Sequence, residues 1–144
     1  MAYLIVDNQN NLYKVAENEE AKNNLNCTFP PYTTIDISDD DFLKITQGLV
    51  EVNISDGVAT LTDLSAEWTI PDEDTLKIRH NEIKETLDSF LRANPSHNMY
   101  TEYKNYFDYL STFDYSSVSY PISKTWEYYC EQNSIPYFHA LQIP

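Results

Sequence analysis

The stretch LVEVNISDGVATLTDL, residues 49–64, places the dipeptide Asp56-Gly57 between two runs of alternating apolar and polar residues. Asp-Gly is typical of a two-residue type I′ turn, because both central positions of that turn need positive φ angles. The turn and the alternation agree on one register, so the sequence predicts an antiparallel hairpin with one buried face. The predicted pairs are Ile54–Ala59 and Val52–Leu61 on the apolar face, and Asn53–Thr60 and Glu51–Thr62 on the polar face.

The segment before this hairpin predicts more antiparallel sheet and two short helices. Two β-rich runs separated by turn residues indicate a first hairpin, and a run after Pro30-Pro31 indicates a further strand. Ser38 is suited to cap a helix with an acidic first turn, and Gly48 is suited to end it. Residues 1–64 are therefore expected to form a small N-terminal α+β module. Its predicted elements are strands 3–6, 12–15 and 32–37 and helices 17–25 and 39–47.

The composition changes at residues 65–74, an acidic stretch with Pro71, and we place the boundary to a second module, residues 65–144, there. Two stripes of apolar and aromatic residues follow at helical spacings of three and four. They predict two helices that turn at residues 94–98 and cover each other as an antiparallel hairpin. The first stripe is Leu76, His80, Ile83, Leu87 and Phe90, and the second is Met99, Tyr103, Tyr106, Leu110 and Phe113.

The remaining chain predicts a short third helix and an extended end. Ser123 is suited to cap a helix over residues 124–132. Residues 135–144 alternate as a strand would, but Pro136 and Pro144 restrict them to an edge strand or a docked tail. The predicted fold class is α+β: a small N-terminal antiparallel sheet module with a short helix, then a helical hairpin, a short third helix and an extended C-terminal tail.

Composition limits the classes of partner. The chain has 144 residues, 42% of them hydrophobic, and a net charge of -14. Such a charge repels phosphate backbones and anionic lipid headgroups, so we expect neither a nucleic acid nor a membrane as a partner. The N-terminus lacks the basic region of a signal peptide, and Cys27 and Cys130 are too few for a disulfide framework.

The sequence shows no catalytic or ligand-binding motif. The histidines at positions 80, 97 and 139 lie in different predicted elements without metal-ligand spacing, and the only two glycines leave no phosphate-binding loop. Cys130 has no basic neighbour in sequence, although it could meet His139 in space. We therefore predict no catalytic, cofactor-binding or metal-binding residue, and keep a thiol or acid/base enzyme only as a weak alternative.

Aromatic residues are concentrated between positions 100 and 138. They are more numerous than the core of two helices can hide, and tyrosine and tryptophan are favoured where proteins contact each other. One hypothesis is that they form a partner-binding surface; the other is that they complete a core that is poor in Leu and Ile. The residues predicted to bind a partner are Tyr103, Tyr106, Tyr109, Tyr120, Trp126, Tyr129, Tyr137 and Phe138.

Residues 76–126 resemble the small tail assembly chaperones of tailed bacteriophages. The positions that carry the resemblance are Lys77 and Arg79 at a basic helix start, Leu87 and Leu91, then Tyr103, Tyr106 and Leu110, and finally Tyr120-Pro121. Residues 125–130 and 139–144 also look like the C-terminus of small tail-module proteins of marine phages. The resemblance implies a protein without catalytic residues that binds a tail or tail-fibre polypeptide. It would act in the host cytoplasm during assembly, or remain in the virion tail.

A second function class stays open. The net charge would also suit an acidic inhibitor that mimics DNA and blocks a host nuclease or regulator. Such a mimic requires carboxylates in rows at phosphate-like spacing on one face, whereas a uniformly acidic surface would serve solubility. A homo-oligomer is compatible with either class.

Overall fold

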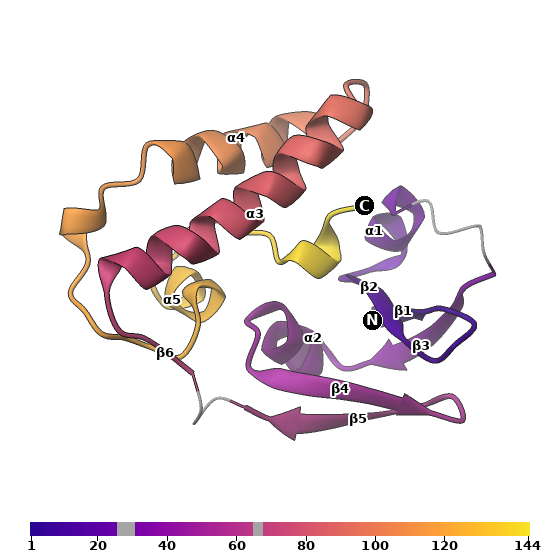
Figure 1. Ribbon diagram of the computed structural model, residues 1–144. Helices are drawn as coiled ribbons and strands as arrows, with labels where there is room; N and C mark the ends of the chain where they lie inside the picture. Colours follow the sequence, from indigo (N-terminus) through magenta and orange to yellow (C-terminus); the bar gives the residue numbers. More distant parts are fainter. Residues whose placement is uncertain (26–30, 65–67) are drawn as a thin grey trace.

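A computed structural model describes residues 1–25, 31–64 and 68–144 (Figure 1). The fold is mixed α+β, with antiparallel sheet in the N-terminal half and most of the helix in the C-terminal half, as the sequence predicts. The described strands form a three-stranded sheet in the order β2-β1-β3 and two separate two-stranded sheets, β4-β5 and β6-β7.

The three-stranded sheet is built on β1 (Ala2–Val6), which pairs antiparallel with β2 (Leu12–Ala16) and with β3 (Thr33–Ile37). The predicted first hairpin and third strand are thus confirmed. Two short helices accompany the sheet, α1 (Glu19–Asn24) and α2 (Asp39–Thr46). Ser38 caps α2 as predicted, since its hydroxyl accepts a hydrogen bond of 3.1 Å from the Asp41 amide.

The hairpin of β4 (Val50–Ser55) and β5 (Val58–Asp63) has the predicted register, with Ile54 opposite Ala59 and Val52 opposite Leu61. Its turn has φ angles of 50° at Asp56 and 76° at Gly57, the positive values that an Asp-Gly turn supplies. The apolar face packs against the N-terminal core, which is formed by Ala2, Leu4, Val6, Val15, Phe42 and Ile45.

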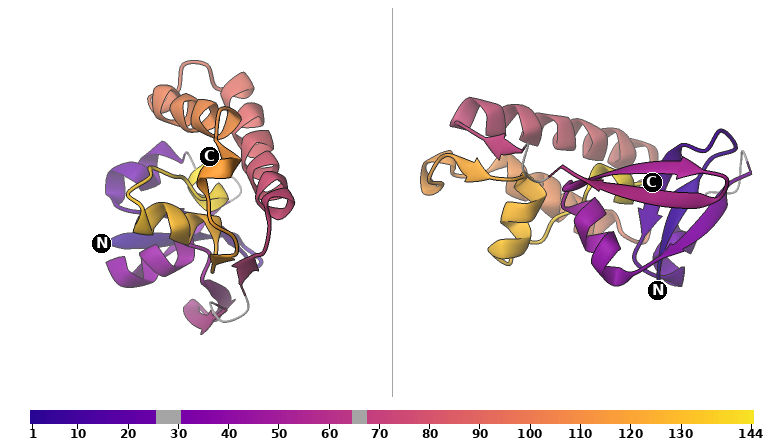
Figure 2. Two further views of the ribbon diagram at one scale, coloured as in Figure 1. Left: turned by 90° about the vertical axis from the view of Figure 1, so that its left-hand side faces the viewer. Right: turned by 90° about the horizontal axis from the view of Figure 1, so that it is seen from below.

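The predicted helical hairpin is also present. Helix α3 (Glu73–Ala93) begins at the N-cap Asp72 and buries the predicted stripe, and α4 (Tyr100–Ser111) lies beside it (Figures 1 and 2). Helix α5 (Trp126–Gln132) closes the helical core from the other side. A single turn of 3₁₀ helix, η2 (Tyr115–Ser117), connects α4 toward α5.

Two short strands join the start of α3 to the start of α5. β6 (Thr69–Ile70) pairs antiparallel with β7 (Ile122–Ser123), a contact between segments about fifty residues apart that the sequence does not predict. This pairing places the N-terminal turns of the two helices side by side, and so positions the site described below.

The C-terminal tail forms the docked segment rather than the strand of the two predicted alternatives. It ends in a 3₁₀ turn, η3 (Ala140–Gln142), that lies between the helices and the N-terminal sheet (Figure 1). The Lys14 ammonium donates a hydrogen bond of 2.5 Å to the Ile143 carbonyl, and Tyr103 donates one of 3.2 Å to the Gln142 carbonyl. Ile143 is fully buried in the helical core. The tail therefore contacts both predicted modules.

Candidate functional site

A groove opens where β6, the first turns of α3 and the start of α5 meet. Its volume is about 470 Å³. We call it the junction groove, because the end of α2 and the C-terminal tail also reach it. Its lining comprises Gly48, residues 68–70, Thr75, Ile78, Arg79, Glu82, residues 124–127 and His139.

Helical periodicity explains which residues of α3 line the groove. Thr75, Ile78, Arg79 and Glu82 recur at spacings of three and four residues and thus share a face of the helix. On the opposite side, Thr125 caps α5 by accepting a hydrogen bond of 3.1 Å from the Tyr128 amide. The cap fixes the direction of the first turn, so that Glu127 enters the groove.

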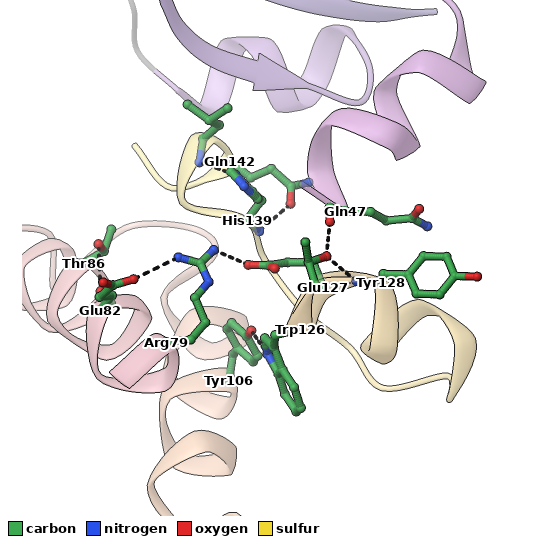
Figure 3. A network of polar contacts seen from close by, with 12 residues as sticks. Gln47, Arg79, Glu82, Thr86, Tyr106, Trp126, Glu127, Tyr128, His139 and Gln142 are labelled. Carbon is green, nitrogen blue, oxygen red and sulfur yellow. Dashed lines mark hydrogen bonds and ion pairs between the residues drawn. The ribbon is translucent and has the colours of Figure 1, made fainter. Parts of the chain in front are cut away.

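An ion pair links the two sides. The Arg79 guanidinium donates to the Glu127 Oε1 atom, and its other amino group lies 3.4 Å from the Glu82 carboxylate (Figure 3). The Glu127 side chain is only 2% exposed, whereas Glu82 is 62% exposed at the rim. Burial lowers the pKa of Arg79, but the Glu127 and Glu82 carboxylates together more than offset this, so the pKa lies above its ordinary value. The guanidinium therefore stays charged and neutralises one buried carboxylate.

Two further polar groups at the groove are used to hold the fold. The Thr125 hydroxyl donates to the Gln47 carbonyl while accepting from Tyr128, so it ties α5 to the end of α2 (Figure 3). His139 Nδ1 accepts a hydrogen bond of 3.2 Å from the Leu141 amide and so caps η3. Burial lowers the pKa of His139, which keeps the imidazole neutral at pH 7.

The groove has an apolar rim as well as a charged floor. Trp68 is 46% exposed and Ile78 is 61% exposed, both large values for such side chains. Ile70 and Trp126 continue the apolar wall inward and are buried. The arrangement suits a ligand with an apolar body.

Three of the residues predicted to bind a partner are core residues, and the structure corrects the prediction for them. Tyr103, Tyr106 and Trp126 are at most 4% exposed. Their polar atoms are satisfied inside, since Trp126 Nε1 donates a hydrogen bond of 3.1 Å to the Tyr106 hydroxyl. Their rings complete the helical core, as the second interpretation of the aromatic surplus has it, but that core is not poor in Leu and Ile, which supply eight of its fourteen buried residues.

The other five residues predicted to bind a partner lie around the same helical core. Tyr109 is exposed at 37%, whereas Tyr120, Tyr129, Tyr137 and Phe138 are partly buried and pack against core residues. Burial raises the pKa of Tyr137 to about 12. Only Tyr109 thus offers a large exposed aromatic surface, and none of the five lines the junction groove.

The residues that form the groove were not predicted from the sequence. Trp68 lies in the stretch interpreted as a linker. Glu127 lies in a helix whose predicted cap, Ser123, was wrong, because Ser123 belongs to β7 and Thr125 caps α5. One signal was present, because Ile78 is an apolar residue between Lys77 and Arg79, off the buried stripe of α3. An apolar residue on the polar face of an amphipathic helix is a reason to expect a contact there.

Metal and thiol chemistry find little support in the described residues. Within them, no group of three or more His, Cys, Asp or Glu side chains is close enough to hold a metal ion. Cys130 is fully buried, and burial raises the pKa of its thiol well above the ordinary range, so it stays protonated. Cys27 lies outside the described residues.

The chain matches no protein-family model, no curated protein and no solved structure. Over the described residues, none of the helices has the length and apolarity needed to cross a membrane.

Proposed function

We propose that this chain is a non-enzymatic, tail-associated protein of a bacteriophage that binds a tail or tail-fibre polypeptide. The observation that carries the proposal is the junction groove, whose rim exposes Trp68 and Ile78 while its polar groups are engaged in holding the fold. Exposed tryptophan beside a concave apolar wall is characteristic of surfaces that anchor a partner side chain.

The family resemblance supplies the phage context. It lies mainly in α3 and α4, the two helices that form the aromatic core and one wall of the groove. The net charge of -14 would keep the chain and an apolar client in solution during assembly in the host cytoplasm. Mass spectrometry of purified phage particles would distinguish a chain that is retained in the virion from a chaperone that leaves the tail.

Co-expression with the tail and tail-fibre genes of the parent phage tests the proposal. We expect one tail polypeptide to co-purify with the chain, and Ile78→Glu to abolish this, because a charge at the rim opposes burial of the apolar contact. Val58→Glu is the matched control, since Val58 is 63% exposed on the β4-β5 hairpin and outside the groove lining. Failure of every tail polypeptide to bind the unmodified chain would refute the proposal.

An acidic DNA mimic is the second candidate, and the net charge favours it. The arrangement of α3 argues against it, because Glu73 pairs with Lys77 and Asp88 pairs with Arg92 rather than standing in unpaired rows. A mimic would displace DNA from a nuclease, and its binding would weaken steeply as salt is added. Tail binding through an apolar rim would lose little affinity under the same change.

A further inference from the structure

The charged side chains of the junction groove balance one another. Arg79 and Lys124 supply two positive charges to its described lining, and Glu82 and Glu127 supply two negative charges. Arg79 pairs with both carboxylates (Figure 3), and the Lys124 ammonium lies 4.3 Å from the centre of the Tyr128 ring. This balance favours an uncharged ligand, because a charged one would be desolvated there without a free counter-charge.

The buried polar atoms of the groove already have hydrogen-bond partners. The Thr125 hydroxyl donates to the Gln47 carbonyl. His139 Nδ1 accepts from the Leu141 amide. Among the buried side-chain nitrogen and oxygen atoms of the described residues, only His80 Nε2 has no partner, and His80 does not line the groove. A ligand therefore gains affinity here through apolar and ring contacts rather than through new hydrogen bonds.

Two flat π-systems are available to such a ligand. Trp68 at the rim is 46% exposed, and its carbonyl accepts a hydrogen bond of 3.1 Å from the Lys124 amide, which holds this residue in line with β6. The Arg79 side chain is 31% exposed, and its ion pairs lie at its two amino groups, so stacking on the guanidinium face is a contact that they leave open. An aromatic ring stacks on a guanidinium and packs edge to face with an indole, whereas an aliphatic side chain does neither.

We infer that the junction groove is a receptor site for an uncharged aromatic side chain of the partner polypeptide, with the ring between the Arg79 guanidinium, the Trp68 indole and Ile78. The volume of about 470 Å³ lies within the range of sites for small ligands, so one ring and its flanking backbone have room. This inference rests on the proposed function, since it specifies the chemistry of the polypeptide that is bound. It adds that recognition is centred on one aromatic anchor.

A titration of the full chain with blocked pentapeptides tests the site. The probe has a central phenylalanine between alanine and glycine residues, and its controls have cyclohexylalanine, arginine or glutamate at that position. The indole N–H signal of Trp68 in ¹H–¹⁵N spectra, assigned with Trp68→Phe, is the readout. We expect the phenylalanine peptide to shift this signal with a dissociation constant on the order of 1 mM. Cyclohexylalanine, which has the size of the ring without its π-system, should bind about threefold more weakly, and the charged side chains about tenfold more weakly.

Variants connect the binding to the named residues. Arg79→Lys keeps a positive charge beside Glu127 but removes the flat guanidinium, so the preference for phenylalanine over cyclohexylalanine should fall below about twofold. Ile78→Ala, at an exposed position outside the ion pair, is expected to weaken the phenylalanine peptide about threefold and keeps the test decisive if Arg79→Lys does not fold. Val58→Ala, outside the groove, should leave the affinity unchanged.

Four results would overturn the inference: an unmoved Trp68 signal, cyclohexylalanine binding as tightly as phenylalanine, a charged peptide binding as tightly, or a Trp68 signal that moves with protein concentration alone, which would assign the groove to a second copy of the chain. Its failure is separable from failure of the proposed function. If a tail polypeptide co-purifies but the phenylalanine peptide does not bind, the aromatic anchor is wrong while the binding role stands. If the phenylalanine peptide binds as expected but no tail polypeptide does, the binding role is wrong.

Discussion

At the scale of single residues, local sequence predicts which polar side chains lie on a buried face. The neighbours that surround such a side chain depend on the whole fold. His80 was predicted to lie on the apolar stripe of α3, and it is fully buried there. Its environment was not predictable, because Tyr115 and Trp126 reach it from segments far along the chain. Its Nδ1 atom lies 2.9 Å from the Tyr115 hydroxyl, while Nε2 is a buried atom without a hydrogen-bond partner.

The first prediction concerns acid stability. Burial, with contributions from Lys84 and Arg79, lowers the pKa of His80 from 6.5 to about 4. A histidine that is harder to protonate in the folded state contributes stability that is complete above pH 6.5 and is lost as the pH falls toward 4. The difference in pKa corresponds to about 3 kcal/mol of unfolding free energy at most.

Urea denaturation between pH 7 and pH 4 measures this loss. His80→Phe should flatten the part of the pH dependence that lies between these values. An identical pH dependence in His80→Phe and in the unmodified chain would show that His80 is not the titrating group.

The second prediction concerns the buried ion pair. Arg79→Met should lower the unfolding free energy by about 3 kcal/mol, because it leaves the Glu127 carboxylate buried without its counter-charge. Arg92→Met is the matched control: Arg92 is 80% exposed and pairs with Asp88 at the surface, so its loss should cost less than about 0.5 kcal/mol. Equal effects of the two substitutions, measured by thermal or urea unfolding, would contradict the role given to Glu127.

At the scale of elements, the parts that the sequence predicted well are those decided by neighbouring residues. The β4-β5 hairpin follows from Asp56-Gly57 and strict alternation, and α3 follows from one apolar stripe. The β6-β7 pair and the junction groove are assembled from segments separated by about fifty residues or more, which no local pattern encodes.

The aromatic residues also show that local sequence does not predict contacts between distant segments. The periodicity of α4 correctly placed Tyr103 and Tyr106 on one face, but it could not decide whether that face meets solvent, a partner or the rest of the chain. α5 and the C-terminal tail supply the missing cover, with Trp126 and Phe138 packed against these two tyrosines. The partner-binding prediction for Tyr103 and Tyr106 therefore failed because it counted only two helices as the available core.

The third prediction tests the hairpin turn. Gly57 has a φ angle of 76°, and the space around its Cα is open, so a side chain there is opposed by backbone strain alone. Gly57→Ala should lower the unfolding free energy by about 1 kcal/mol, and Gly57→Asn by less, because asparagine tolerates positive φ angles. Chemical denaturation compares the two; an alanine variant as stable as the unmodified chain would contradict the turn geometry.

At the scale of the whole molecule, the C-terminal tail joins the N-terminal sheet to the helical core. Ile143 is buried in the helical core, while Leu141 packs against the N-terminal core and Lys14 holds the tail carbonyls. The sequence predicted modules over residues 1–64 and 65–144 and left the tail's contacts open. Because the tail contacts both the N-terminal sheet and the helical core, we expect the stabilities of these two parts to be coupled.

The fourth prediction follows from that coupling. Ile143→Ala should lower the unfolding free energy by about 3 kcal/mol, since it creates a cavity at a fully buried position. Hydrogen exchange should then accelerate in β2 and in α4 together, because the tail supports both. Ile78→Ala, at an exposed position, should leave exchange in both elements unchanged. Acceleration confined to α4 would show that the halves are stabilised independently.

The central claim, that the chain acts by binding a tail polypeptide at the junction groove, is tested most directly by crosslinking during infection. A photoreactive benzoylphenylalanine is placed at position 78 on the rim, or at position 58 on the hairpin as the control, and crosslinked products are identified by mass spectrometry. We expect that position 78 captures a tail or tail-fibre polypeptide and that position 58 does not. Equal capture at both positions, or capture of no tail polypeptide at position 78, would contradict it.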